Sequence, residues 1–367
     1  MSVTHRRPRR PSCTFVSLTG PDGNIGDALI RRGTLEWALG TSDELVVYTG
    51  ESPDVWLRQL GVPADATVLR SKRSVPRWLW MLASAPSRPV LVFEAGEVPL
   101  HKGNGLRELI FLAETVLVRL KRGVVVRPPR GIRAPSNPSS WLHARAARLS
   151  QVALWRDAAS AALAGGTTVV PDIGFAVAAA STDATEPPRQ RDQLLVSLRG
   201  ARPMPSEAWL HAVRNTASAH GLRIRTVVQV REDETRAREL AAALGGEFDA
   251  WGDTDSVTQE AQLRERYANA KLVVSDRMHV LVLAAIDGAS PAELVPNPTG
   301  KITAAFATVG IHNITLDAEN ADAPEMQAFL DAQLTRADEI TQHVETARQF
   351  LDDIERRMRE TIRAARA

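Results

Sequence analysis

Residues 271–306, KLVVSDRMHVLVLAAIDGASPAELVPNPTGKITAAF, decide the predicted fold. An apolar run over 272–274 ends in a polar tip over 275–279, and a second apolar segment over 280–286 follows as a predicted helix. In α/β folds this order presents side chains to a ligand beyond the carboxyl end of the sheet. The side chains here that can carry positive charge are Arg277, His279 and, after a proline-rich turn, Lys301. We therefore predict an anion site, because the N-terminus of a helix also favours negative charge.

The same order of strand, polar tip and helix recurs on both sides of residues 181–192, a polar and proline-rich segment. Strands that alternate with helices predict parallel, doubly wound sheets. At 367 residues the chain is also too long for one ordinary hydrophobic core. We predict an α/β protein with two Rossmann-like lobes that face each other across a cleft, which is the GT-B-like arrangement, followed by a long C-terminal helix.

Composition shifts along the chain define the predicted domains. The first residues carry four arginines and no acid, which is typical of a disordered basic tail. From Pro324 onward the chain has helical periodicity and many charges, as expected of a terminal helix that packs back on both lobes. The predicted domains are the tail (1–11), the N-terminal lobe (12–180), a linker (181–192), the C-terminal lobe (193–322) and the terminal helix (323–367).

Composition and charge exclude several classes of protein. The net charge is +2, and without the four tail arginines it is 2 − 4 = −2, so the body is not a broadly basic nucleic-acid binder. No apolar run reaches the roughly 18–20 residues that span a bilayer, so we predict no transmembrane segment. A single cysteine, Cys13, favours a reducing compartment. We predict a cytoplasmic protein, and leave open both contact of the tail with the inner face of the membrane and a homo-oligomer.

A glycine-rich turn follows the first predicted strand. Its segment GNIGDALI places Gly23, Asn24, Gly26 and Asp27 just before a helix, at the predicted sheet edge. The turn lacks the Gly-x-Gly-x-x-Gly spacing of a dinucleotide site. Two interpretations stay open: a loop that shapes a ligand site, or a tight turn in which Asp27 caps the helix.

Other charged residues follow predicted strands at the same edge. Glu94 and Glu97 come after a buried strand, in a loop. Arg156, Asp172 and Arg199 each follow a later strand. Structural interpretations stand beside the functional ones: Arg156 pairs with Asp157 or with a partner on the facing lobe, Asp172 caps a helix, and Arg199 is a solvated strand end.

Five short segments, taken in order, resemble the polysaccharide pyruvyl transferase family between about residues 20 and 310. GNIGDALI resembles the family's opening loop, ALWRDAASAAL its Arg-Asp/Glu-x-x-Ser segment, and VVPDIGF its Pro-Asp-x-x-Phe segment. SDRMH with the later Lys301 resembles its Ser/Thr-Asp-Arg-Leu-His-Gly segment and lysine, and FEAG stands where the family has a glycine cluster. The departures are Glu94 and Ala95 for glycines, Met278 for leucine and Val280 for glycine.

The resemblance implies an enzyme that moves the pyruvyl group of phosphoenolpyruvate onto two hydroxyls of a sugar, as a ketal. The acceptor would be a saccharide or lipid-linked saccharide of a cell-envelope polysaccharide or glycolipid. It would bind the N-terminal lobe, and phosphoenolpyruvate the C-terminal lobe. The donor carries a carboxylate and a phosphate, both of which suit cationic side chains. The predicted donor-binding residues are Arg156, Arg199, Arg277, His279 and Lys301.

Ketal formation needs a proton for the methylene carbon and a base for the attacking hydroxyl. We predict His279 as the acid, because the pKa of histidine is nearest to neutrality. Asp27 is the predicted catalytic base, although Glu94 and Glu97 fit that role equally well. The predicted acceptor or loop residues are Gly23, Asn24, Gly26, Glu94 and Glu97. We predict no metal and no cofactor, because the histidines show no metal-ligand spacing.

Other functions use the same residues. A GT-B glycosyltransferase with a nucleotide-sugar donor would bind its diphosphate through Arg277 and Lys301. A non-catalytic relative would bind saccharide, or act as a scaffold in envelope assembly. A purely structural alternative has Asp276 capping the helix and paired with Arg277, and His279 buried with its partners. A serine hydrolase and a P-loop site are excluded, because the sequence has neither a Gly-x-Ser-x-Gly elbow nor a Walker loop.

Overall fold

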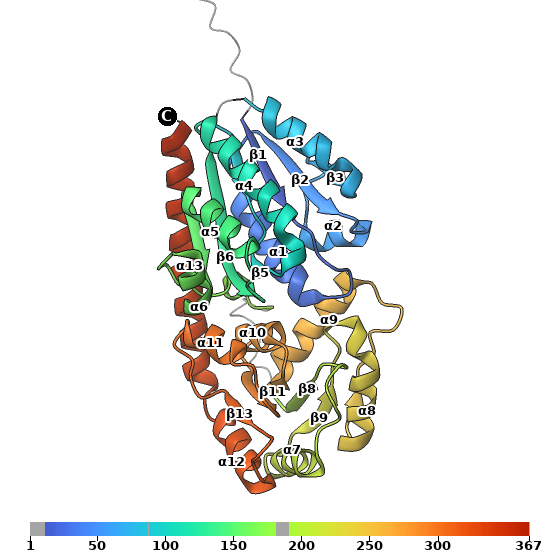
Figure 1. Ribbon diagram of the computed structural model, residues 1–367. Helices are drawn as coiled ribbons and strands as arrows, with labels where there is room; N and C mark the ends of the chain where they lie inside the picture. The colour runs from blue at the N-terminus through green and yellow to red at the C-terminus, as the bar shows by residue number, and fades with distance from the viewer. Residues whose placement is uncertain (1–11, 87, 181–190, 367) are drawn as a thin grey trace, which may run out of the picture.

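The chain folds into two α/β lobes, with the terminal helix α13 (Ala337–Arg366) running alongside both (Figure 1). The computed structural model describes residues 12–86, 88–180 and 191–366. The predicted two-lobed, doubly wound, GT-B-like fold with a long C-terminal helix is confirmed. The predicted basic tail, and residues 181–190 of the predicted linker, lie outside the described residues.

The N-terminal lobe is built on a seven-stranded sheet in the order β3-β2-β1-β4-β6-β5, with β7 also paired to β6. These pairs are parallel, so the chain returns through crossover connections that place helices on both faces. The strands are β1 (Cys13–Ser17), β2 (Glu44–Gly50), β3 (Thr67–Arg70), β4 (Val90–Val92), β5 (Gly96–Pro99), β6 (Val124–Arg133) and β7 (Val152–Trp155).

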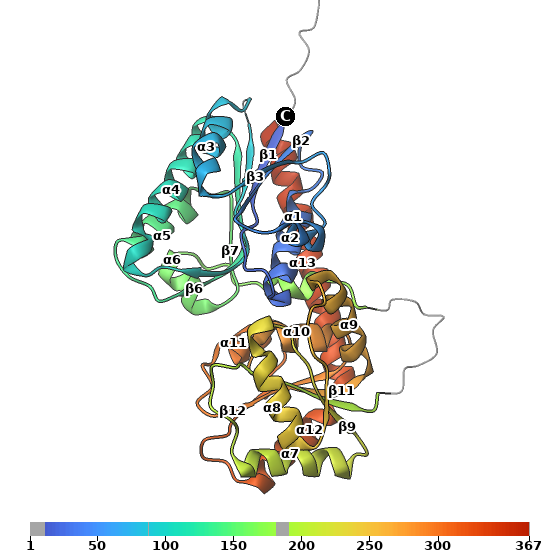
Figure 2. The same cartoon turned by 90° about the vertical axis from the view of Figure 1, so that its right-hand side faces the viewer.

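Alternate residues of these strands pack into two apolar layers, one on each face of the sheet. In β4, Val90 and Val92 pack in the layer that also contains the terminal helix, and Leu91 packs in the opposite one. The first layer contains α1 (Ile25–Ala38), α2 (Asp54–Leu60) and the end of α13. The second contains α3 (Val75–Ser84), α4 (Gly105–Leu120) and α5 (Ser139–Leu149), which Figure 2 shows on the face away from α13. The short α6 (Ala158–Ala164) follows β7.

The C-terminal lobe has a six-stranded parallel sheet in the order β10-β9-β8-β11-β12-β13. Its strands are β8 (Gln193–Ser197), β9 (Arg223–Thr226), β10 (Glu247–Phe248), β11 (Ala270–Ser275), β12 (Ser290–Val295) and β13 (Thr315–Asp317). Its helices are α7 (Glu207–Ala219), α8 (Glu234–Leu244), α9 (Ser256–Asn269), α10 (Met278–Ile286), α11 (Lys301–Ala307) and α12 (Ala323–Leu334). Short 3₁₀ turns are η1 (Lys72–Ser74), η2 (Lys102–Asn104), η3 (Ile173–Ala176) and η4 (Arg231–Asp233).

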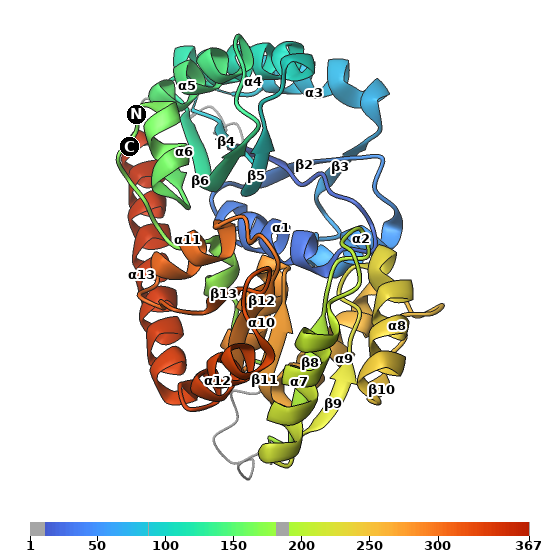
Figure 3. The ribbon, with the colours of Figure 1, turned by 60° about the horizontal axis from the view of Figure 1, so that its bottom comes forward.

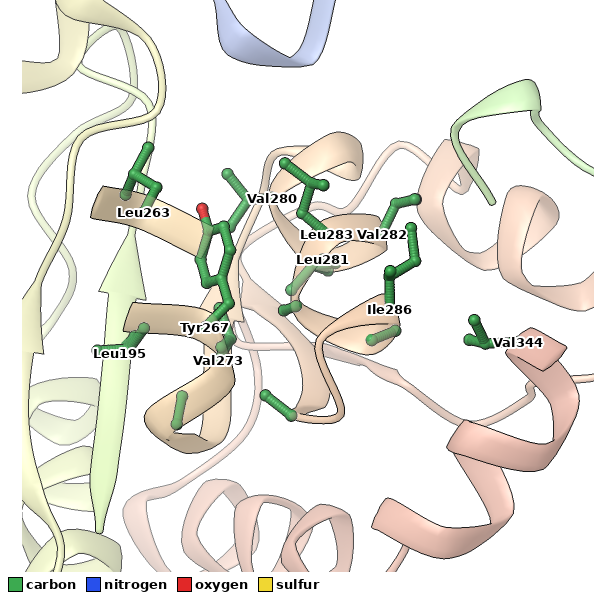
Figure 4. Close-up of a cluster of buried hydrophobic side chains, with 14 of the residues drawn as sticks. Leu195, Leu263, Tyr267, Val273, Val280, Leu281, Val282, Leu283, Ile286 and Val344 are labelled. Carbon is green, nitrogen blue, oxygen red and sulfur yellow. The ribbon is translucent and has the colours of Figure 1, made fainter. Parts of the chain in front are cut away.

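Helix α10 lies in the interior, in contact with both lobes. It is apolar on every side, as the segment VLVLAAI requires, and such a helix is stable only where all of its faces are covered. Its side chains join one core cluster with Ile25 and Leu29 of α1 and with Tyr267 of α9. Val280, which replaces the family glycine, is fully buried and belongs to this cluster (Figure 4). The valine side chain is therefore part of the core and does not line the cleft.

The predicted single terminal helix is two helices. Helix α12 ends at Leu334, where Thr335 caps it, and α13 begins at Ala337 (Figure 3). Met326 and Leu330 of α12 pack in the C-terminal core beside α7. Helix α13 contributes Ile340 and Val344 to the cluster around α10, and Met358 and Ile362 to the N-terminal lobe. The two helices bury their apolar stripes against different surfaces, which requires the chain to turn between them.

The prolines of residues 128–138 predict a loop after a strand that ends at Arg127, but in the structure the strand continues to Arg133. Residues 130–133 of β6 pair with β5, an additional strand that lies in the predicted loop of Glu94 and Glu97. Proline is unfavourable in a strand because it has no N–H, so its presence suggested a loop. The pairing shows that the two prolines are compatible with β6, and the β5–β6 extension carries Glu97 and Arg133 to the cleft.

Buried charged groups lie between the N-terminal sheet and helices α4 and α5. Arg127 is fully buried, and Glu108 Oε2 lies 2.8 Å from Nδ1 of buried His143. Trp78 Nε1 donates a hydrogen bond of 2.8 Å to Glu114 Oε1. Burial raises the pKa of Glu114 to about 7, and the Trp78 hydrogen bond and the Arg127 charge offset only part of this shift.

Replacing Glu114 with glutamine is expected to remove a pH dependence of stability. The folded pKa of about 7 lies above the ordinary 4.5, so between these values the native state holds a proton that the unfolded state releases. The free energy of unfolding therefore falls as the pH rises through this window, by at most about 3 kcal/mol. Glutamine mimics the protonated form, so the variant should melt higher than wild type above pH 7 and equally at low pH. Glu360→Gln, exposed on α13, is the control, and an unchanged pH slope would contradict the prediction.

Candidate functional site

The carboxyl ends of both sheets meet at a cleft between the lobes, which holds a cavity of about 310 Å³. Five arginine or lysine side chains and three carboxylates line it, together with His279. The N-terminal lobe contributes Asn24, Gly26, Asp27, Ile30, Glu97, Arg133 and Arg156. The C-terminal lobe contributes Arg199, Gln229, Val230, Asp276, Arg277, Met278, His279, Thr299, Lys301 and Ile302. Of the predicted site residues, Gly23 and Glu94 do not line this cavity.

Arg277 stands at the N-terminus of α10 and is held by Asp233 of η4. Its Nη2 donates to Asp233 Oδ1 at 2.7 Å, and Nε donates to the other carboxylate oxygen. Asp233 is 2% exposed, so this buried carboxylate fixes the guanidinium and leaves its remaining edge for the cleft. The structural alternative in which Asp276 pairs with Arg277 is wrong. Asp276 instead accepts a 3.0 Å hydrogen bond from the Arg199 backbone N–H and lies 2.7 Å from Arg202 Nε.

His279 lies in the first turn of α10, with Nε2 3.5 Å from Asp172 Oδ1. Asp172 also accepts hydrogen bonds from the Gly174 N–H at 2.9 Å and from Arg156 Nη1 at 3.0 Å. Burial alone would raise the pKa of Asp172, but the nearby imidazole of His279 and the charge of Arg156 hold it well below its usual range. Asp172 is therefore an ionised group that orients both His279 and Arg156, and its predicted role as a cap of η3 is also confirmed.

Gly26 allows α1 to approach α10 closely. A Cβ atom at this position would lie 2.8 Å from His279 Cβ and 3.0 Å from its Nδ1, which is closer than real Cβ contacts allow. The N-termini of two helices thus meet beside the imidazole, and both carry positive partial charge. The glycine is required here for spacing, because any side chain would push His279 out of place.

An ion pair crosses the cleft between Lys301 and Glu97. Lys301 Nζ donates to Glu97 Oε1 at 2.6 Å, and Arg133 and Arg156 lie 3.3 and 3.7 Å from the same carboxylate. Burial raises the pKa of Glu97, but the Lys301 hydrogen bond and the three cationic charges lower it overall. Glu97 therefore stays ionised. Its carboxylate contacts Lys301, Arg133 and Arg156, and an anionic ligand at the same position would meet the same three cations.

The start of α1 differs from the predicted turn. Asn24, rather than Asp27, caps the helix: its Oδ1 accepts from the Asp27 N–H at 3.2 Å, and its Nδ2 donates to Asp27 Oδ2 at 2.8 Å. Asp27 thus presents a carboxylate to the cavity. Gly23, with φ of +79°, accepts a 2.8 Å hydrogen bond from the Arg231 N–H and serves the contact between lobes.

Glu94 is occupied within the N-terminal lobe. Its Oε2 accepts hydrogen bonds from the Thr19 N–H at 3.2 Å and from Thr19 Oγ1 at 2.7 Å, and it lies 3.6 Å from Arg31 Nε. Its carboxylate fixes the loop after β1, which leads into the helix that carries Asp27. Glu94 therefore positions that loop and does not line the cavity, and its role toward an acceptor stays a prediction.

Several residues at the cleft belong to no motif that the sequence shows. Arg133 follows two prolines that predict a loop, and it reaches the cavity only because β6 pairs with β5. Gln229 and Thr299 carry no motif, and Asp233 lies far along the chain from Arg277. The Arg-Glu-Asp run after the strand at 223–226 resembles the other polar tips, so it was a usable signal for Asp233.

The described part of the chain shows no cluster of three or more histidine, cysteine or carboxylate groups that could hold a metal ion. Within the same ranges no helix has both the length and the apolar composition to cross a bilayer.

Comparison with known proteins supports the fold. No family model matches the chain, and no curated protein matches it. A Listeria monocytogenes protein assigned as a UDP-N-acetylglucosamine 2-epimerase has a TM-score of 0.57 and 13% identity, over 95% of this chain and 97% of that one. The UDP-GlcNAc 2-epimerase of Neisseria meningitidis, bound to UDP-GlcNAc, scores 0.56 at 8% identity, over 93% and 98%. Anabaena Alr3699/HepE in complex with UDP scores 0.53 at 12% identity, over 96% and 100%.

At these identities the likeness establishes the two-lobed fold, with nearly the full length of each chain covered. A shared fold does not determine the reaction, which depends on the residues of the cleft. The resemblance to polysaccharide pyruvyl transferases stays a prediction.

Proposed function

We propose that the cleft transfers the pyruvyl group of phosphoenolpyruvate onto two hydroxyls of a saccharide, as a ketal. The proposal rests on residues from both lobes that meet in one cavity. The segments that resemble the pyruvyl transferase family come from both lobes, and four of the five contribute residues that line one cavity or orient a group within it. These residues are Asn24, Asp27, Arg156, Asp172, Arg277, His279 and Lys301.

The cavity suits a compact, highly charged donor. Arg277 and Arg156 are each held by a buried carboxylate. Their remaining N–H groups therefore have a fixed orientation, and the two side chains need little reorganisation to bind an anion. The described residues that line the cavity include no phenylalanine, tyrosine or tryptophan on which a nucleotide base could stack. A carboxylate and a phosphate on adjacent atoms match two fixed guanidinium groups and Lys301.

The proton steps follow from the same geometry. His279, oriented by Asp172, gives a proton to the methylene carbon, which becomes the methyl group of the ketal and leaves C2 electrophilic. The first sugar hydroxyl adds to C2 and loses its proton to Asp27. The second hydroxyl closes the ring as the C2–O bond to phosphate breaks, and its proton leaves with the phosphate. The products are one cyclic ketal and one inorganic phosphate.

A second candidate is a glycosyltransferase with a nucleotide-sugar donor. The comparisons favour it over phosphoenolpyruvate, because solved structures of the same fold hold UDP or UDP-GlcNAc. A diphosphate would also engage Arg277 and Lys301 at the N-termini of α10 and α11. The two candidates share the anion site and differ in what occupies the rest of the cleft.

Ligand-dependent melting separates the two donors. Phosphoenolpyruvate at about 100 times its dissociation constant should add about 2.7 kcal/mol to the free energy of unfolding and raise Tm accordingly. Inorganic phosphate and pyruvate, tested singly, control for binding of one half of the donor. Stabilisation by UDP-sugars alone would overturn the pyruvyl proposal in favour of the second candidate. Stabilisation by none of these compounds would exclude both donors.

A further inference from the structure

The outer helical layer of the N-terminal lobe carries an exposed apolar surface. Along α4, Leu106, Leu109, Val116 and Leu120 recur on one helical face, and that face is turned to solvent. Leu106 and Leu120 are 71% and 78% exposed, values that are unusual for leucine on a folded protein. Helix α4 lies between α3 and α5 in this layer (Figures 2 and 3).

Each neighbouring helix adds an exposed tryptophan to this surface. Trp80 of α3 is 68% exposed and Trp141 of α5 is 54% exposed. We call the six residues Trp80, Leu106, Leu109, Val116, Leu120 and Trp141 the outer face. Scattered apolar residues are normal on a surface, but a stripe flanked by tryptophans on adjacent helices marks an interaction site.

The exposed charged residues around the outer face are all lysine or arginine in the described part of segments 71–122 and 139–149. Over residues 71–122 and 139–149, eight lysine or arginine residues are exposed. Among them are Lys72 and Arg73 just before α3, Arg77 within it, and Arg119 and Arg122 at the end of α4. The described part of the same segments has no exposed carboxylate. Of the four acids in these segments, Glu108 and Glu114 of α4 are buried, and Glu94 and Glu97 are partly buried. This arrangement contrasts with α13, where exposed acids and arginines alternate.

We propose that the outer face docks the protein on an anionic lipid bilayer. Leucines and tryptophans enter the boundary between headgroups and acyl chains, and the lysines and arginines meet the negative headgroups. A second copy of the chain is a poor occupant, because a two-fold contact through this face would bring two basic surfaces together. The inference rests on the helical layer alone and is independent of the donor bound in the cleft.

Vesicle co-sedimentation of the full chain tests the proposal. The protein should bind vesicles of phosphatidylcholine with phosphatidylglycerol and bind pure phosphatidylcholine at least about tenfold more weakly. Raising the salt from about 0.05 M to about 0.5 M should weaken binding further. The double variant Trp80→Ser/Trp141→Ser and the charge reversal Arg73→Glu/Arg77→Glu should each lower partitioning by about tenfold or more.

Matched variants on α13 control for a general effect of surface change. Phe350→Ser replaces an exposed aromatic residue, and Arg356→Glu/Arg357→Glu reverses two exposed charges, so both should bind as wild type does. Circular dichroism and Tm confirm that every variant is folded. Reversal of the tail arginines Arg6 and Arg9 gives a further comparison. Loss of binding in the tail variant but not in the outer-face variants overturns the proposal, as does absence of binding to anionic vesicles.

Discussion

Replacing His279 with asparagine is expected to lower kcat by about 10²- to 10⁴-fold and to leave donor affinity within about threefold of wild type. The imidazole lies in the cleft with Nε2 3.5 Å from the ionised Asp172, which holds it in place for proton transfer. Asparagine keeps a polar group of similar width next to Gly26 but has no titratable proton near neutral pH. Turnover is measured as phosphate released from phosphoenolpyruvate in the presence of a saccharide acceptor, and donor affinity by ligand-dependent melting.

The control for this variant is His211→Asn, on an exposed position of α7. It should leave both kcat and donor affinity unchanged. If His279→Asn turns over normally, the acid role is wrong and the imidazole serves only to pack against Gly26. If it loses donor affinity and turnover in equal measure, His279 binds the donor and does not transfer a proton.

Replacing Arg277 with glutamine is expected to raise the donor Kd by about 10- to 100-fold, because a charge-assisted hydrogen bond contributes roughly 1.5–3 kcal/mol. The substitution also leaves Asp233 without its cation, and an unpaired carboxylate that is 2% exposed costs stability. The single variant should therefore show both a lower Tm and weaker donor binding. Thermal melting with and without phosphoenolpyruvate measures the two effects together.

The double variant Arg277→Gln/Asp233→Asn separates binding from stability. Removing the unpaired charge should restore most of the Tm, while donor affinity stays low because the guanidinium is still missing. Recovery of donor affinity in the double variant would show that Arg277 acts only as a structural partner of Asp233. Arg264→Gln, which breaks a buried pair with Asp287 outside the cleft, should lower Tm without changing donor affinity.

Much of the fold could be predicted because it is encoded in short-range pattern. The run over 280–286 is apolar on every side, and this composition already requires a helix in the interior. The strand that ends at Ser275, and the polar residues that follow it, likewise depend only on neighbours along the chain. The placement of Arg199, Arg277 and Lys301 at one edge then follows from parallel strands, whose carboxyl ends coincide.

The predictions of secondary structure are wrong at two places, where contacts between residues distant in sequence outweigh the local preference of the chain. Prolines at the start of the segment 128–138 suggested a loop, yet β6 continues through them because β5 pairs with its end. The helical periodicity after Pro324 suggested one helix, but the chain turns near Thr335 so that α12 and α13 can cover different cores. In both cases the deciding partner lies elsewhere in the chain.

The sequence by itself determined the classes of residue at the cleft. These are cations that follow strands, an imidazole at the start of α10, and carboxylates that follow strands of the other lobe. Only the tertiary structure decided their partners. Asp233 lies 44 residues from Arg277, and Glu97 lies 204 residues from Lys301, so these pairs form only after the chain has folded. Helical periodicity likewise placed the leucines of α4 on one face, but packing of the sheet against the other face turned them outward. Side-chain type and local spacing follow from the covalent order, whereas pairing and exposure depend on which surfaces the folded chain brings together.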